Sequence, residues 1–428
     1  MSRSRRPRGA PEGGQLAFGK RSESSVALSA QHGGNLSPWP AVEWEQQQWH
    51  HHLIGGLTRR ERQAQGRQSY RSSIPATIAH RQVIVGGETL ADLDEATARV
   101  AGFESDSRRL PAPLLGVLLR SESASSSQIE HITASARAVA EAQVTGQGSG
   151  NAALVAANVH AMTQALAGTE PITPERIESI QRTLMRDRLQ LAGWRQEPVW
   201  IGGADSSPVD ADFVPPDHRR IPGAIADLTE FIARDDLPVL AQAAIAHAQF
   251  ETIHPFADGN GRTGRALVHL ILQQKQLATS ATVPVSGGLL ADKANYFDAL
   301  TAYREGDAGP IISVFSRAAL HAVANGERLA TRVAAVQNNW RERIVARADS
   351  SVWKVIDVLP EHPVADAEGL ARAIGGDSRN IHRQLRLLTE TGVLIQSKHY
   401  KSRRMLFRAP DLLHALDEYA RGFGRRAG

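Results

Sequence analysis

The segment around His254 constrains the fold more than any other part of the chain, because it has the pattern of two helices joined by a tight loop. Apolar residues recur every three or four positions from Val239 to Ile253, which predicts a helix that leads up to His254. Pro255 disfavours a helical conformation at the residue before it, and the glycines that follow favour a turn. The helical period resumes at Leu267. We therefore expect a short loop held between two helices.

The polar residues of this loop are of the kinds that bind phosphate and move protons. In the turn from Gly259 to Gly261, backbone N–H groups at the positive end of the next helix can form a cradle for an anion. Arg262 and Arg265 are three apart, hence on one face of that helix, and each guanidinium can bind phosphate oxygens. Asp258 offers an oxygen ligand for nucleotide-bound Mg²⁺, and His254 can take a proton from a hydroxyl group. A plain polar turn would explain any one of these residues, but not all of them together.

The composition is that of a folded protein. Of the 428 residues, 42% are hydrophobic and 22% are charged, and the length suits two or three domains. A net charge of only +4 does not make the whole chain a polyanion binder. The absence of cysteine excludes disulfides, thiolate metal sites and a cysteine nucleophile. No apolar run reaches the roughly 20 residues that span a bilayer, so we expect a cytoplasmic protein without membrane contact.

Differences in composition divide the chain into four parts. Residues 1–65 begin with an Arg-, Gly- and Pro-rich stretch that has little to bury, so we expect a disordered extension. Residues 66–145 and 146–330 have the amphipathic patterns of a mainly α fold. Residues 345–420 change to short helices followed by two short strands around a basic turn. That order resembles a winged helix-turn-helix domain.

Local patterns place several elements in the two central parts. Ser125–Ala142 and Ala152–Leu166 have the apolar spacing of helices. The pair Thr173-Pro174 is a suitable N-cap and first turn for another helix. Gly193–Gly203 is β-prone and bounded by glycines, which predicts a short hairpin.

In the last part, a helix beginning near Ser378 would bury one apolar face and expose a basic one. The candidate DNA contacts on the basic face are Arg379, Arg383 and Arg386. Winged helices also bind proteins or pack between subunits, so DNA and protein partners both stay open for this part.

The loop HPFADGNGRTGR resembles the signature HPFx[D/E]GN[G/K]R of the Fic family, and every defined position from His254 to Arg262 matches it. VWIGG at Val199–Gly203, FVPP at Phe213–Pro216 and NYFDAL at Asn295–Leu300 are also similar to that family. The resemblance covers roughly Ser69–Ala322. It implies a mainly α, Fic-type helical bundle with a short β-hairpin flap, followed here by the winged helix-turn-helix domain.

The resemblance implies a protein adenylyltransferase that moves AMP from ATP, with Mg²⁺, to a Tyr, Ser or Thr hydroxyl of a protein substrate, including the chain itself. His254 would be the catalytic base and Asp258 the metal ligand. Arg262 would bind the β-phosphate and Arg265 the γ-phosphate. The nucleotide-binding residues implied in the same way are Gly259, Asn260, Gly261, Arg262, Thr263, Gly264, Arg265 and Tyr296, with Val199, Trp200, Ile201 and Gly202 in the flap. A homodimer through the Fic core is compatible with the resemblance.

The segment from Ser126 to His131 resembles the inhibitory motif [S/T]xxxE[G/N] of the same family. Glu130 would pair with Arg265 and block the place of the γ-phosphate. Ser126, four residues earlier on a helix, would orient the carboxylate. His131 departs from the motif, where Gly or Asn is usual. The alternative is an ordinary helix in which Glu130 is solvated.

Two other functions are compatible with these residues. In one, the Fic core only senses nucleotide and the C-terminal domain acts as a DNA-binding regulator. The retained His254 argues against it, because sensing ATP needs no base. In the other, the same site removes AMP or transfers a different phosphate-containing group.

Overall fold

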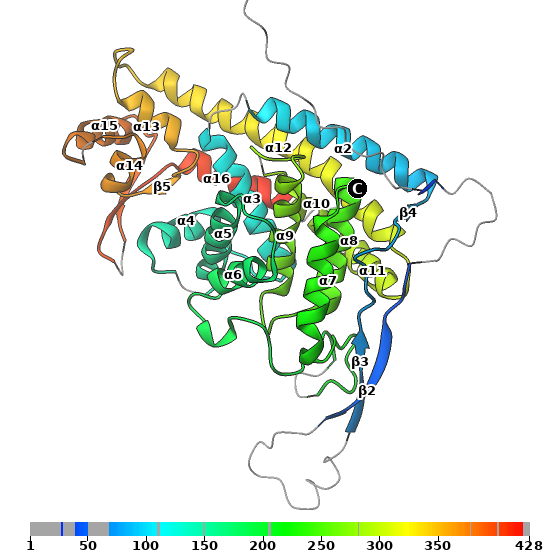
Figure 1. Cartoon of the computed structure of the whole chain (residues 1–428). Coiled ribbons are helices and arrows are strands. Elements are labelled where there is room, and N and C mark those ends of the chain that lie inside the picture. The colour runs from blue at the N-terminus through cyan, green and yellow to red at the C-terminus, as the bar shows by residue number, and fades with distance from the viewer. Residues whose placement is uncertain are drawn as a thin grey trace, which may run out of the picture.

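The computed structural model describes residues 27–28, 39–49, 68–108, 112–148, 150–203, 207–280, 282–376, 378–399 and 402–422. Helices dominate these residues, and their strands form small sheets at the periphery (Figure 1). The predicted mainly α fold is confirmed. None of the described helices is both long and apolar enough to cross a membrane.

The centre of the bundle is a helix buried along almost its whole length. Its residues from Leu240 to Ile253 are all buried, which explains why most of their side chains are apolar. Helices before and after it in the chain pack around it (Figure 1). The helices of this region are α5 (Asn151–Ala167), α6 (Pro174–Leu184), α7 (Ile221–Ala233), α8 (Val239–Ile253), α9 (Asn260–Gln274), α10 (Val285–Ala291) and α11 (Lys293–Arg304). The predicted N-cap is confirmed, since Thr173 accepts a hydrogen bond from the Arg176 amide at 3.3 Å.

Three earlier helices and one long later helix cover this centre. They are α2 (Gly87–Ser107), α3 (Ala112–Ile129), α4 (Ala136–Thr145) and α12 (Gly309–Arg343). Figure 1 shows α12 running beside α2 toward the C-terminal segment. The single helix predicted over Ser125–Ala142 is wrong. The chain leaves the helix after Ile129, His131 has the left-handed φ of 60°, and Ser135 caps a new helix.

The prediction of a hairpin within Gly193–Gly203 is also wrong. Trp194 bridges Phe256 and Ile201 bridges Phe213, so the two ends of this segment pair with different partners. The antiparallel hairpin lies instead between β2 (Glu43–Trp49) and β3 (Gln68–Ile74).

Strand β2 corrects part of the expectation of disorder over residues 1–65. Its sequence is mostly polar, but Trp44 packs edge-on against Phe213 at 6.0 Å and Trp49 against Trp200 at 5.4 Å. These partners are distant in the chain, so the local composition does not reveal them. A second short pair joins β1 (Ala27–Leu28) to β4 (Ile84–Val85). Apart from residues 27–28 and 39–49, the extension lies outside the described residues.

The C-terminal segment consists of short helices and short strands, including the strand Val364–Ala365 and the helix Pro410–Gly422, which were not predicted from the sequence. The elements are α13 (Val352–Val358), β5 (Val364–Ala365), α14 (Ala367–Ala373), α15 (Ser378–Glu390), β6 (Ile395–Lys398), β7 (Met405–Arg408) and α16 (Pro410–Gly422). The strands form an antiparallel sheet in the order β5-β7-β6. Helix α16 returns to the bundle, where Asp417 accepts a hydrogen bond at 2.7 Å from the Ala136 amide at the start of α4.

Candidate active site

His254 ends the central helix in a conformation that turns the chain into the loop. Its φ and ψ are 47° and 60°, in the left-handed region, and its amide still donates to the Phe250 carbonyl at 2.8 Å. The buried guanidinium of Arg195 donates to the His254 carbonyl at 2.9 Å. The backbone is therefore fixed from both sides, while the imidazole keeps 20% of its surface exposed.

A carboxylate that sequence reasoning missed lies behind this imidazole. Oε2 of Glu251 is 3.6 Å from Nδ1 of His254, and the carboxyl group is buried. Although burial opposes it, the imidazoles of His254 and His247 lower the pKa of Glu251 to about 2. Glu251 is thus ionised at neutral pH. The signal in the sequence was an acid one turn before the histidine, in a helix whose side chains are mostly apolar.

Asn260 closes the loop. Its side-chain oxygen accepts from the Phe256 amide and its side-chain nitrogen donates to the Phe256 carbonyl, each at 2.9 Å. Phe256 itself is buried and stacks on Trp194, with ring centroids 4.8 Å apart. Gly259 has a φ of 86°, and a side chain there would collide with Met185. Since Asn260 holds the loop through both polar atoms of its side chain, the backbone N–H groups are the donors most available to an anion.

Arg262 is the buried cation of the loop. It is 3% exposed, and its Nη2 donates to Asp258 at 3.1 Å. Its Nε and Nη1 have no hydrogen-bond partner among the described residues. Burial lowers the pKa of Arg262. A buried guanidinium with free donors is stabilised by an anion that reaches them.

Asp258 fits a metal ion that arrives with a nucleotide. It is the only carboxylate of the loop, and its oxygens contact Arg262 and Nη1 of Arg188, the latter at 2.8 Å. Among the described residues, no group of three acidic or histidine side chains could hold a metal by itself. Mg²⁺ commonly uses one or two carboxylates together with phosphate oxygens and water. The donor set is therefore suitable for nucleotide-bound Mg²⁺.

The structure brings together Ser126, Glu130 and Arg265. Nη2 of Arg265 donates to Oε1 of Glu130 at 2.9 Å and to the Ser126 carbonyl at 2.8 Å, while its Nε donates to the Ser126 hydroxyl at 2.9 Å. Although burial opposes it, the Glu130 carboxylate raises the pKa of Arg265. Ser126 thus holds the guanidinium rather than the carboxylate. A side chain at Gly261 would overlap Glu130, so that glycine makes room for the contact.

The remaining residues that the sequence predicts at the nucleotide site include both buried and exposed side chains. Gly264 and Thr263 are buried in α9, and a side chain at Gly264 would press on Glu251. Tyr296 is buried with its hydroxyl 2.7 Å from Nε2 of His247, so its ring is part of the core. The next residue, Phe297, is an aromatic ring with 45% exposure. The flap residues are Val199, Trp200, Ile201 and Gly202, all partly or largely exposed.

Comparison with known proteins shows what the region around this loop is similar to. Residues 171–272 match the model of the Fic/DOC family. A probable protein adenylyltransferase of Aquifex aeolicus (strain VF5) is 31% identical over 130 residues, which are 28% of this chain and 37% of that protein. Protein adenylyltransferase Fic of Nematostella vectensis is 27% identical over 154 residues, which are 35% of this chain and 33% of that protein. This chain thus spans about a third of the length of the curated relatives it matches.

One solved structure is similar over most of the chain. A Fic family protein from Desulfovibrio desulfuricans G20 has a TM-score of 0.50 and 22% sequence identity, covering 78% of this chain and 97% of that one. At this identity the similarity concerns the fold. The family match contains the loop and all but the last two residues of α9, while Glu130, Tyr296 and the C-terminal segment lie outside it.

Proposed function

We propose that this chain, in which residues 171–272 form a Fic/DOC domain, transfers AMP from ATP to a hydroxyl side chain of a protein. The observation that carries the proposal is the buried Arg262 with two unpaired nitrogens at the start of α9. A glycine turn, a helix N-terminus and a free guanidinium together favour a bound phosphate chain. The relatives named protein adenylyltransferase support AMP as the transferred group.

His254 acts as the base in this proposal. The ionised Glu251 lies 3.6 Å from Nδ1, which favours a proton on that nitrogen and leaves Nε2 to accept the proton of the target hydroxyl. The hydroxyl oxygen then bonds to the α-phosphorus of ATP. The bond between that phosphorus and the oxygen bridging to the β-phosphate breaks, and pyrophosphate leaves with the electron pair.

The other residues of the loop bind and orient the nucleotide. Backbone N–H groups from Gly259 onward and the free nitrogens of Arg262 would hold the phosphates. Asp258 would hold Mg²⁺, and the ion would supply positive charge beside the phosphates. The exposed ring of Phe297 is available to stack on the base, and the flap at Val199–Gly202 offers a backbone edge for the target chain.

We further propose that the contact between Glu130 and Arg265 inhibits the enzyme. Arg265 has three hydrogen bonds to Ser126 and Glu130, so it is not free to bind a terminal phosphate. The Glu130 carboxylate also lies against Gly261, where its negative charge repels a phosphate. ATP can bind productively only when Glu130 moves away.

Intact-mass spectrometry of the purified chain after incubation with Mg·ATP tests the proposal. We expect a mass gain of one AMP in the Glu130→Gly variant. No gain is expected when the substitution His254→Asn is added to that variant. Parallel incubations with UTP, and with a previously modified protein, separate AMP transfer from transfer of UMP and from removal of AMP. The absence of any nucleotide adduct, both on the chain itself and on proteins of a cell extract, would refute AMP transfer.

Glu251→Gln should slow transfer about tenfold while leaving the KM for ATP nearly unchanged. The substitution keeps the volume of the side chain but removes the charge that orients His254 and favours its productive tautomer. Steady-state rates in the Glu130→Gly background measure this effect. An unchanged kcat would show that Glu251 serves only the fold, and Glu230→Gln, at an exposed site on α7, is the matched control.

The C-terminal segment favours a second function, binding of DNA through α15. Arg383 and Arg386 are exposed on this helix, and neither has an ion-pair partner among the described residues. Ile381, Leu385 and Leu388 pack its other face into the core. Only the backbone of Arg379 is described. An unpaired basic face on a packed helix suits contact with phosphates.

If α15 binds DNA, the double substitution Arg383→Gln and Arg386→Gln should weaken binding. The slope of log K against log salt concentration should become shallower by about two, because two phosphate contacts are lost. Fluorescence anisotropy with a DNA duplex at several salt concentrations measures both quantities. Arg372→Gln is the matched control, because Arg372 is exposed on α14 and already pairs with Glu368. Equal binding by the double variant and the control would exclude this face.

A further inference from the structure

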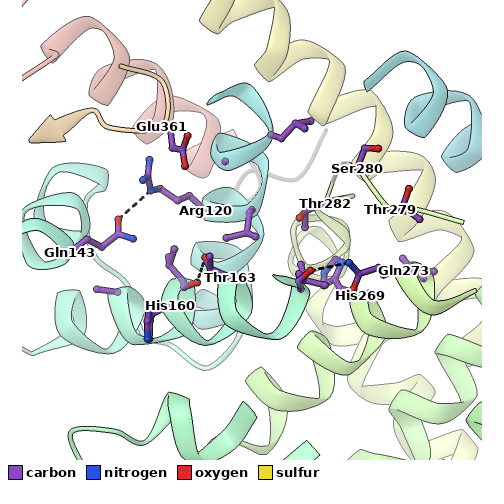
Figure 2. Close-up of a pocket in the computed structure, with 18 of the residues that line it drawn as sticks. Arg120, Gln143, His160, Thr163, His269, Gln273, Thr279, Ser280, Thr282 and Glu361 are labelled. Atoms are coloured by element: carbon purple, nitrogen blue, oxygen red, sulfur yellow. Dashed lines mark hydrogen bonds between the residues drawn. The ribbon is translucent and has the colours of Figure 1, made fainter. Parts of the chain in front are cut away.

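A cavity of about 520 Å³ lies away from the catalytic loop, between α3, α5 and the C-terminal half of α9. Figure 2 shows Arg120, Gln143 and His160 on one side of it and His269 and Thr282 on the other. Leucines of α3 and α9 supply its apolar wall. Its volume falls in the range of roughly 300–1,000 Å³ that is usual for small-molecule sites.

The polar groups of this cavity favour an anion. Arg120 donates to Gln143 at 3.2 Å and to the Pro360 carbonyl at 3.5 Å, and it has no ion-pair partner among the described residues. Burial lowers the pKa of Arg120 to about 10. Burial and the neighbouring Arg186 also lower the pKa of His160. One carboxylate, Glu361, also lines the cavity and raises the pKa of Arg120, but no ion pair joins the two among the described residues. Two guanidinium groups, those of Arg120 and Arg186, line the cavity with it, so the positive charge exceeds the negative charge and favours an oxyanion.

The walls of the cavity belong to the elements that hold the inhibitory contact. Arg120 lies on α3, less than two turns before Ser126, and His269 lies on α9 one turn after Arg265. From α5, the buried Asn158 donates to the Ser123 carbonyl at 2.8 Å and to the Ser127 hydroxyl at 3.2 Å, which fixes α3 in place. We call α3 docked when it packs on α5 and α9 as it does here. A ligand that contacts all three helices would bind most tightly to this docked arrangement.

We propose that this cavity binds a small organic phosphate monoester and that the ligand stabilises the docked position of α3. Arg120, His160 and the nearby hydroxyl groups match the phosphate, and the leucine wall accommodates an organic part. Inorganic phosphate alone would leave most of the volume unfilled. The expected effect on activity rests on the proposed AMP transfer, whereas the expected binding does not.

Isothermal titration calorimetry with ribose 5-phosphate, in the absence of ATP, tests the site. We expect binding that Arg120→Gln weakens at least tenfold, since a charge-assisted contact is lost. Arg262→Gln should leave the affinity unchanged, because it removes only the cradle of the catalytic loop. His160→Gln, on an exposed part of the wall, provides a second decisive variant if Arg120→Gln does not fold.

Three results would overturn the ligand assignment: no binding of ribose 5-phosphate, equal affinity in the cavity variants, or tighter binding of inorganic phosphate or ribose. The regulatory part is tested separately by the rate of self-modification. Ribose 5-phosphate should lower that rate several-fold in the wild type and leave it unchanged in Glu130→Gly. Binding without any effect on an active wild type would overturn the coupling. Binding by a chain that transfers nothing would uphold the site and refute the enzyme.

Discussion

Glu130→Gly should raise the rate of self-AMPylation by about five- to thirtyfold. Arg265 is 2% exposed and holds Glu130 at 2.9 Å, so removal of the carboxylate frees the guanidinium for a terminal phosphate. Because Glu130 is 41% exposed, solvent weakens its ion pair with Arg265. We therefore take the free energy of this ion pair as about 1–2 kcal/mol, well below that of a fully buried ion pair. This free energy corresponds to about a five- to thirtyfold change in rate if the Glu130–Arg265 contact must break before transfer.

Matched variants separate the charge of Glu130 from its volume. Glu130→Gln keeps the side chain against Gly261 but loses the ion pair, so we expect a smaller gain than for glycine. Ser126→Ala removes one of the hydrogen bonds of Arg265 and should activate weakly. Glycine at 130 follows the last residue of α3 and does not interrupt a helix. Equal rates for the wild type, Glu130→Gln and Glu130→Gly would show that this contact does not inhibit the enzyme.

The conformation of the loop from His254 to Gly261 could be predicted because its determinants are close in sequence. Asn260 bonds both backbone groups of Phe256, four residues away, and Gly259 takes the positive φ that the turn requires. The departure at His131 also has a local explanation. Its φ of 60° is the conformation that Gly and Asn adopt most readily. In this chain, Nζ of Lys293 contacts the histidine at 2.9 Å and donates to the Ile129 carbonyl at 2.6 Å.

The parts that could not be predicted depend on contacts between distant segments. Strand β2 is polar, and only its pairing with β3 and its tryptophan contacts make it a strand. The hydroxyl of the buried Tyr296 lies 2.7 Å from Nε2 of His247, a contact that no spacing in the sequence indicates. Arg188 meets Asp258 across 70 residues, and no periodicity or spacing connects the two. Glu251 was within reach of local reasoning, since it precedes His254 by one helical turn.

His254→Asn should abolish detectable transfer even in the Glu130→Gly background. Loss of a general base lowers the rate by about 10²–10⁴-fold. Asparagine is a better substitution than alanine, because it adopts the φ of 47° at this position more readily. The backbone turn, the bond from Arg195 and the phosphate cradle should therefore all survive the substitution.

Nucleotide binding distinguishes loss of the base from loss of the site. Titration with a non-hydrolysable ATP analogue should give the same affinity for Glu130→Gly with and without His254→Asn, since the imidazole does not hold the phosphates in the proposed mechanism. An Arg262→Gln variant in the same background should instead lose affinity, because its buried nitrogens are the donors left unpaired. If His254→Asn retains transfer at more than about a tenth of the parent rate, another group takes the proton. Glu251, the buried carboxylate nearest to that imidazole, would then be the first candidate.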